Sequence, residues 1–504
     1  MQPTVEQANF KKFAVENPKK SIVLEAVAGS GKTTTLLNTA KDMSGNTAII
    51  AFNKAIAEEL KRKLVKMGLG FPQFQAGTCH SYGFSAYKKL VQTPIVNSSK
   101  VFDIVEDYFE NMKNIDEPLP FELKSMVRKA VSMAKQNGIG VEGHISIEDD
   151  ENWDSIIEHY DINDSDKIEN SEVINVSKKI LRLSNNQMNI IDFDDMIYLP
   201  LLYRAKFYTF DNVMIDEAQD INWVRREMAS RMKKPGGRII AVGDRNQAIY
   251  GFSGADSDSL DLIRKKFNAV EMSLSVCFRC GTSIVDFSNR WNTKIKAKEG
   301  AATGVVENML FEDFMKETLN SESVMLCRNT KPLVETAFKL IRQGIPVYVE
   351  GRDIGEGLKK LASRWKVTDI NDLVDRLETW KDKEVEKLTL KKKEAKIAGI
   401  MDQFETMMVI IDRCRAKHLH KVSDVLYEIE SIFQDSPNGK ATHFTLSTIH
   451  RSKGREWKTV YWLDRVRTLP SKYAKQAWQI GQENNLCYVA ATRAMERLVE
   501  VTGE

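Results

Sequence analysis

The chain has 504 residues, of which 42% are hydrophobic and 28% charged, and this composition is typical of a globular protein that can bury large cores in three or four domains. Its net charge of +3 is too small to indicate an acidic or basic partner, because such binding depends on a local groove. No apolar run reaches the length of a membrane span, and the N-terminal residues lack a signal peptide, so we expect no membrane partner and a cytoplasmic protein.

Short β-rich runs beside turn residues or helical patterns predict two α/β units with parallel sheets. The first unit lies before about residue 275, and its predicted strands are Ser21–Leu24, Thr47–Phe52, Val213–Ile215 and Arg238–Val242. The second unit follows, and its predicted strands are Ser323–Cys327, Ile345–Val349, Thr445–Ile449, Thr459–Leu463 and Arg497–Val501.

Each unit contains a segment with a mainly helical pattern. The predicted organisation is a first core at residues 1–90 and 186–275 with a helical insertion at 91–185, and a second core at 276–355 and 439–504 with a helical insertion at 356–438. An acidic stretch, Glu148–Asp166, predicts a solvated surface in the first insertion. The charged run Lys381–Glu394 predicts an exposed helix face with opposite charges three to four residues apart, and a nucleic-acid contact is the alternative.

A glycine-rich loop, Ala-Val-Ala-Gly-Ser-Gly-Lys-Thr at residues 26–33, follows the first predicted strand. In such a loop, backbone N–H groups surround phosphate oxygens, Lys32 reaches the β- and γ-phosphates, and the Thr33 hydroxyl ligates Mg²⁺. The helix that begins here turns its positive end toward the anion. Ala26 stands where the usual pattern has its first glycine. The predicted nucleotide contacts are Ala28, Gly29, Ser30, Gly31, Lys32, Thr33 and Thr34.

Two carboxylates, Asp216 and Glu217, follow the predicted strand Val213–Ile215. Adjacent side chains at a strand end point in different directions, so Asp216 can hold Mg²⁺ while Glu217 accepts a proton from water. In-line phosphoryl transfer to water requires this division of roles. An ordinary surface acidic cluster is the alternative, and the phosphate loop disfavours it. The two segments together predict nucleoside-triphosphate hydrolysis.

Six cysteines are scattered along the chain, and Cys277 and Cys280 form its only C-x-x-C pair. A zinc site would need a second pair or histidines at ligand spacing, and none lies nearby in the sequence. We therefore expect reduced thiols.

The residues around the two phosphate-binding segments resemble the motifs of superfamily 1 DNA helicases of the UvrD/Rep/PcrA type. Asp216–Asp220 (Asp-Glu-Ala-Gln-Asp) is similar to the Walker B segment of that family. Other stretches match in the family's order: Gln7, Phe52–Ala55, Gly77–Ser81, Val242–Ala255, Phe278-Arg279, Thr448–Trp457 and Tyr488–Ala494. The resemblance implies two RecA-like P-loop domains, each interrupted by a helical insertion, in a compact member with a short second insertion.

This resemblance assigns nucleotide contacts beyond the glycine-rich loop. It implies that Gln7 reads the adenine, Phe278 stacks on it, and Glu456 contacts the ribose. It also implies that Gln247 senses the γ-phosphate and couples it to DNA. The implied cofactors are ATP and Mg²⁺, with Thr33 and Asp216 as the metal ligands.

Two arginines of the second unit, Arg279 and Arg493, are the candidates for stabilising the transferring phosphoryl group. An arginine in this role contributes about 10³–10⁵ in rate. A surface or interdomain salt bridge is the alternative for each of them. The implied catalytic residues are Lys32, Asp216, Glu217, Gln247, Arg279 and Arg493.

Flat side chains inside the motifs are candidates for holding the bases of a single strand, since stacking on an aromatic ring contributes about 1–3 kcal/mol per base and tolerates any sequence. An aromatic ring in the hydrophobic core is the alternative. The implied nucleic-acid contacts are Phe52, Asn53, Thr78, His80, Tyr250, Phe252, Thr448 and His450.

Three departures from the family bear on affinity more than on chemistry. Phe252-Ser253 stands where relatives usually have Trp-Arg, Thr34 where many have an arginine, and Asn484-Asn485 where they often have two arginines.

The expected function is an ATP-dependent translocase and helicase on single-stranded DNA, and the resemblance implies 3′→5′ movement. Expected partners are single-stranded DNA, junctions with duplex, and a single-strand-binding or replication and repair protein. We expect a monomer, associated with the nucleoid or, for a viral protein, acting in the host cytoplasm. One alternative is a translocase that displaces proteins or needs a partner to unwind. The other is a nucleotide-gated nucleic-acid-binding protein without motor activity.

Overall fold

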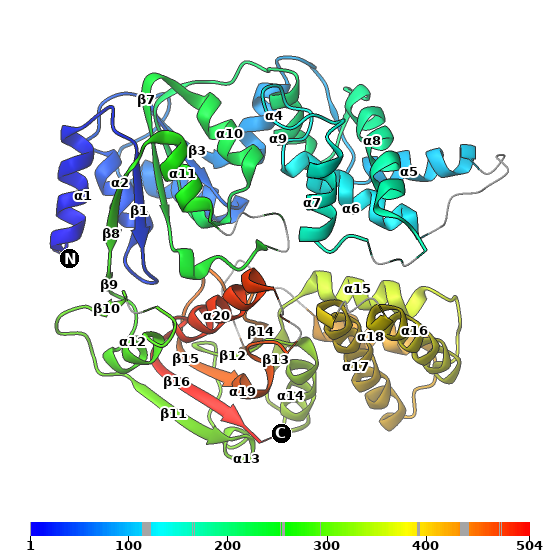
Figure 1. Ribbon diagram of the computed structural model, residues 1–504. Coiled ribbons are helices and arrows are strands. Elements are labelled where there is room, and N and C mark those ends of the chain that lie inside the picture. Colours follow the sequence, from blue (N-terminus) through cyan, green and yellow to red (C-terminus); the bar gives the residue numbers. More distant parts are fainter. Residues whose placement is uncertain are drawn as a thin grey trace. The chain divides into compact units, whose positions relative to one another are not determined.

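The computed structural model divides into two compact units (Figure 1), Met1–Ala26 with Gly31–Leu274, and Val27–Ser30 with Ser275–Glu504. The described residues are 2–112, 122–163, 165, 167–251, 254, 258–292, 294–390, 394–433, 443–472, 474 and 476–503. Within them, no helix is both long enough and apolar enough to cross a membrane.

The first unit is built on a six-stranded parallel sheet in the order β3-β2-β6-β7-β1-β8. Its strands are β1 Ile22–Ala26, β2 Thr47–Ala51, β3 Phe74–Thr78, β6 Phe210–Ile215, β7 Lys233–Gly243 and β8 Val270–Leu274. The strands β1 and β2 are buried at every position, as expected for a parallel sheet covered on both faces. Successive side chains of β1 point to opposite faces of the sheet, so Val23 belongs to one hydrophobic cluster and Leu24 to another.

Helices cover both faces of this sheet. They are α1 Val5–Glu16, α2 Lys32–Ala40, α3 Lys54–Lys66, α4 Cys79–Tyr87, α9 Asp195–Leu202, α10 Trp223–Met232 and α11 Ser259–Phe267, with short 3₁₀ turns η2 Ala218–Asp220 and η3 Arg245–Gln247. Side chains cap several N-termini: the hydroxyl of Thr4 caps α1, the amide oxygen of Asn53 caps α3, and the hydroxyl of Thr78 caps α4.

Between α4 and α9 in the sequence, the described residues form helices that gather beside these two (Figure 1): α5 Lys100–Asn111, α6 Leu123–Gln136, α7 Asp150–His159 and α8 Asn170–Asn186. A short parallel pair, β4 Ile95–Val96 with β5 Ile190–Ile191, joins the two ends of this segment. The acidic stretch is partly paired: Asp150 contacts Lys178 and Glu148 contacts Arg182. Asp164 and Asp166 lie outside the described residues.

The second unit is built on a six-stranded parallel sheet in the order β11-β16-β15-β12-β14-β13. Its strands are β11 Val305–Leu310, β12 Ser323–Cys327, β13 Val347–Val349, β14 Phe444–Thr448, β15 Trp457–Leu463 and β16 Ala494–Thr502, and a separate pair joins β9 Val276–Cys277 to β10 Lys296–Ala297. The fold class is confirmed, because both units contain a parallel sheet with flanking helices.

The helices of this unit are α12 Thr282–Ser288, α13 Phe311–Phe314, α14 Thr330–Arg342, α15 Arg352–Ser363, α16 Ile370–Leu390, α17 Glu394–Ala416, α18 Val422–Ile432, α19 Arg465–Thr468 and α20 Ala477–Ala491. The helices α15 to α18 gather beside α14 (Figure 1), and one hydrophobic cluster joins residues of α14, α17 and α18 to the sheet. The Asp402 carboxylate of α17 accepts hydrogen bonds from the backbone N–H groups of Thr330 and Lys331 at the start of α14. In the charged run, Lys381 pairs with its neighbour Asp382. The boundaries of both insertions stay predictions.

Candidate ATP site and nucleic-acid contacts

The predicted site residues of the first unit follow the carboxyl ends of five neighbouring strands. Lys32 and Thr33 at the start of α2 follow β1, Phe52 follows β2, Thr78 ends β3, Asp216 follows β6, and Gln247 follows β7. Open parallel sheets bind ligands at the carboxyl ends of their strands, because the loops that follow the strands converge there.

The start of α2 has the geometry of a phosphate-binding helix end. Gly31, its N-cap residue, has φ 75° and ψ 32°, a left-handed conformation that glycine adopts without a Cβ clash. Lys32 is the first residue of α2. The Thr33 hydroxyl lies 3.1 Å from Asp216 Oδ2, so two oxygen ligands suited to Mg²⁺ stand side by side. The site therefore fits a magnesium–nucleotide complex.

Gln7 lies near the same helix. Its side-chain amide donates to Thr35 Oγ1 of α2 at 3.0 Å, and its amide oxygen accepts from the backbone N–H of Thr4. The N-terminus of α1 is thus fixed beside α2, where the adenine contact was predicted.

The two carboxylates after β6 occupy different environments. Asp216 is 4% exposed, and burial, followed by the charge of Glu217, raises its pKa to about 6. Glu217 has φ 52°, a left-handed conformation that costs an ordinary residue free energy and is common at functional sites. Its Oε1 lies 3.5 Å from the Lys32 ammonium. The strand end therefore separates a buried carboxylate, at the predicted metal position, from a second one beside the lysine predicted to bind phosphate.

Aromatic side chains lie next to this site in the same unit. The rings of Phe52 and Tyr250 stack with centroids 5.6 Å apart and planes 10° apart, and both are partly exposed. His80 on α4 meets the ring of Phe193 edge-on at 6.3 Å. Burial, followed by the charge of Arg225, lowers the pKa of His80 to about 4, so this imidazole is neutral at pH 7.

Asn53 and Thr78 serve as helix caps. Asn53 Oδ1 accepts the backbone N–H of Ile56, and Thr78 Oγ1 accepts that of Ser81. Each cap lies where the positive end of a helix is oriented to favour an anion such as a DNA phosphate. Phe252, the remaining aromatic residue predicted from the motifs, lies outside the described residues.

The second unit brings together Arg279 and Glu456. Arg279 Nε donates to Glu456 Oε2 at 2.5 Å, and its Nη1 donates to the carbonyl of Thr492 at 3.1 Å. Arg493 is 1% exposed, and its guanidinium donates to the carbonyls of Val489 and Arg455. These contacts orient Arg493 within its own unit, and its role at the nucleotide stays a prediction.

Phe278 directly follows Cys277 in the sequence, and its side chain is partly buried. Thr448 ends β14, and His450 follows it. Burial, followed by the charges of Arg328 and Lys453, lowers the pKa of His450 to about 3, so it is neutral at pH 7. Thr448 and His450 therefore lie at the carboxyl end of a strand of the second sheet, whereas Phe278 follows β9 of the separate two-stranded pair.

Two family models together cover most of the chain. The UvrD/REP helicase N-terminal domain matches residues 8–268, and the UvrD-like helicase C-terminal domain matches residues 293–502. The chain belongs to the UvrD/Rep helicase family.

Named relatives in this family are distant. The chain is 23% identical to F-box DNA helicase protein 1 of Schizosaccharomyces pombe over 96% of its own length and 56% of that protein. It is 25% identical to ATP-dependent DNA helicase Rep of Buchnera aphidicola over 51% of its length and 40% of that protein. It is 21% identical to a probable DNA helicase of Mycoplasma pneumoniae over 95% and 80%. The chain spans about half the length of the first curated relatives that it matches.

Gln219 connects two motifs of this UvrD/Rep-type chain, a role that the sequence did not predict. Its side-chain nitrogen donates to Glu217 Oε2 at 2.6 Å, and its oxygen accepts from the backbone N–H of Asp244 at 3.0 Å. Gln247 in turn donates to Asp244 Oδ2 at 2.6 Å. A continuous chain of hydrogen bonds therefore runs from Glu217 to Gln247.

We expect Gln219→Leu to destabilise the first unit. Leucine keeps the volume but leaves the buried N–H of Asp244 without its acceptor, which costs about 1–3 kcal/mol in free energy of unfolding. Urea denaturation of the full chain measures the loss, with Gln92→Leu at an exposed position as the control. Equal stability of the two variants would contradict the assigned role.

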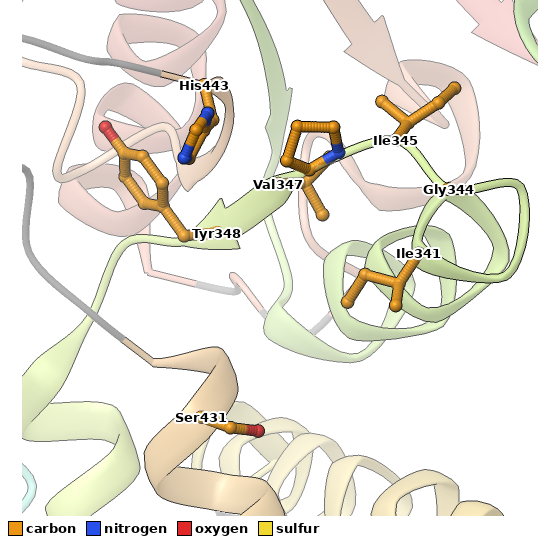
Figure 2. A pocket seen from close by; sticks show the side chains of 8 residues that line it. Ile341, Gly344, Ile345, Val347, Tyr348, Ser431 and His443 are labelled. Atoms are coloured by element: carbon orange, nitrogen blue, oxygen red, sulfur yellow. The ribbon is translucent and has the colours of Figure 1, made fainter.

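A cavity of about 370 Å³ lies in the second unit (Figure 2), and its lining includes none of the predicted site residues. Residues of the α14 end, β13 and α18 line it: Ile341, Gly344, Ile345, Pro346, Val347, Tyr348, Ser431 and His443. The six cysteines are free thiols, and among the described residues no group of three or more histidine, cysteine or acidic side chains is arranged to hold a metal.

Proposed function

We propose that this protein is an ATP-dependent translocase that moves 3′→5′ on single-stranded DNA and unwinds duplex at junctions. One observation supports the proposal: Lys32 at the start of α2 and Asp216 after β6 lie at the same end of one sheet as the stacked pair of Phe52, after β2, and Tyr250, after β7. Membership of the UvrD/Rep helicase family supports it.

The chemical roles follow from the positions of the side chains. Lys32 and the N–H groups at the start of α2 bind the β- and γ-phosphates. Thr33 and Asp216 would hold Mg²⁺, which would supply positive charge to the phosphate oxygens when bound. Glu217 orients the attacking water and accepts its proton. Arg279 and Arg493 are the candidates for stabilising the transferring phosphoryl group, and Glu456 is the candidate for contacting the ribose.

Coupling to DNA follows from one short segment. Gln247 and Tyr250 are three residues apart, so the residue assigned to sense the γ-phosphate and a ring assigned to hold a base belong to the same short segment. A change in the contacts of Gln247 on hydrolysis therefore shifts the base contact. The aromatic rings hold bases without reading them, so we expect little sequence preference.

Three assays test this function: ATP turnover, duplex unwinding and streptavidin displacement. ATP turnover should rise strongly with single-stranded DNA, and unwinding should favour duplexes with a 3′ tail over those with a 5′ tail. Preference for 5′ tails would overturn the polarity. Streptavidin displacement without unwinding would indicate a translocase that displaces proteins or needs a partner. Turnover indifferent to DNA would remove the motor function.

A further inference from the structure

Arg225, which belongs to none of the matched motif segments, lies among the residues assigned to DNA. It stands in the first turn of α10, where its backbone N–H donates to the N-cap side chain of Asn222 at 3.2 Å. Its Cζ lies 5.9 Å from the ring centroid of Phe52, within the range of a cation–π contact. The guanidinium thus borders the stacked pair of Phe52 and Tyr250.

The surroundings of Arg225 come from several elements of the first unit. The helices α4, α9 and α10 pack against one another on one side of the sheet (Figure 1). The charge of Arg225 contributes to lowering the pKa of His80, on the first turn of α4, after burial as the main cause. Arg225 is therefore near two of the predicted base contacts, one after β2 and one after β3.

In the part of the chain that the structure describes, the positive charge of Arg225 has no carboxylate counter-charge. Its Nη1 donates to the carbonyl oxygen of Asp220 at 3.4 Å, a long contact that neutralises no charge. The residue is also only partly buried. A partly exposed guanidinium without a carboxylate partner, beside stacked rings, suits the phosphate of a strand whose base lies on those rings.

We propose that Arg225 binds a backbone phosphate of single-stranded DNA, while Phe52 and Tyr250 hold the adjacent base. The inference rests on the proposed function and adds a phosphate contact to it. The N-termini of α3 and α4, capped by Asn53 and Thr78, lie at the same sheet edge and favour the same anion. Because Arg225 also donates to the carbonyl of Asp220, it joins the DNA contact to the segment that carries Asp216 and Glu217.

The test is the salt dependence of binding. Fluorescence anisotropy with a labelled oligothymidylate, without nucleotide, gives the affinity of the full chain at several salt concentrations. Arg225→Gln should bind about tenfold more weakly, and its slope of log affinity against log salt should be shallower by about 0.7, the value for one phosphate on a single strand. Arg225→Lys keeps the charge and should keep the slope of the unsubstituted protein.

Two further variants serve as controls. One removes a positive charge away from the proposed contact, and the other removes an aromatic ring but no charge. Lys20→Gln removes the same charge before β1, at the opposite edge of the sheet, and should change neither affinity nor slope. Phe52→Leu removes a ring and should weaken binding with an unchanged slope, because no phosphate contact is lost.

The outcomes distinguish the two proposals. If the unsubstituted protein fails to bind the oligonucleotide, the proposed function fails, and the inference with it. If it binds and Arg225→Gln has the same affinity and slope, only the phosphate contact is overturned. Weaker binding by Arg225→Gln with an unchanged slope, or a loss of slope in Arg225→Lys, would also overturn it and leave Arg225 as a packing partner of Phe52.

Discussion

Glu217→Gln should stop ATP turnover and leave ATP binding largely intact. The substitution keeps the shape of the side chain and removes its ability to accept a proton. Loss of a general base lowers rate by about 10²–10⁴. The amide can still accept the 2.6 Å hydrogen bond from Gln219, so the local backbone, with its left-handed conformation at this residue, should persist.

Steady-state ATPase with single-stranded DNA, together with binding of a fluorescent ATP analogue, separates the two effects. Glu16→Gln, an exposed carboxylate on α1, is the matched control and should behave as the unsubstituted protein. Lost nucleotide binding in Glu217→Gln would show that the residue supports the structure of the site. Undiminished turnover would assign the base to another residue.

The inner strands of both sheets could be predicted from the sequence, and most edge strands could not. The residues of β1, β2, β12 and β14 form short apolar or β-branched runs, because neighbours cover these strands on both sides. The strands β3, β8 and β11 stand at the edges and include polar residues such as Gln75, Glu271 and Glu307, which weaken the pattern. β13 is the edge strand that was predicted, two residues longer than observed.

Part of the candidate site follows from motifs, and the rest depends on contacts between segments far apart in the chain. Lys32, Thr33 and Asp216 belong to recognisable motifs, and the structure places them together. Arg225 and Phe193 belong to no segment that the sequence singled out. Phe193 is 56% exposed beside His80, and its position after the apolar pair Ile190–Ile191, within a run of aspartates, is the one signal that could have suggested it.

For Arg493, the sequence motif identified the residue, and the structure shows its contacts within the second unit but not its contact with a nucleotide. Its guanidinium is buried against carbonyl oxygens of the second unit. Sequence and contacts within one unit cannot define what it does when nucleotide is bound, because that depends on a change in those contacts. The same reasoning applies to Glu456, which pairs with Arg279.

Lys32→Ala should remove most ATP hydrolysis. The ammonium group belongs to the first residue of α2 and lies 3.5 Å from Glu217 Oε1. Burial raises the pKa of Asp216, and the charge of Lys32 lowers it. Removing one preorganised donor from developing charge reduces turnover by about 10²–10³. Its loss also favours the protonated form of Asp216, which binds Mg²⁺ poorly because a metal ligand must be deprotonated.

The matched control lies at the other end of the same helix. Lys41 is exposed at the C-cap of α2, so Lys41→Ala removes an equal charge without touching the phosphate-binding end. ATPase rates and the shift of the thermal unfolding midpoint on adding Mg²⁺ and ATP should fall in Lys32→Ala and stay unchanged in Lys41→Ala. Near-normal turnover by Lys32→Ala would refute the phosphate-loop assignment. A lost thermal shift with retained turnover would mean instead that Lys32 binds the nucleotide equally in ground and transition states.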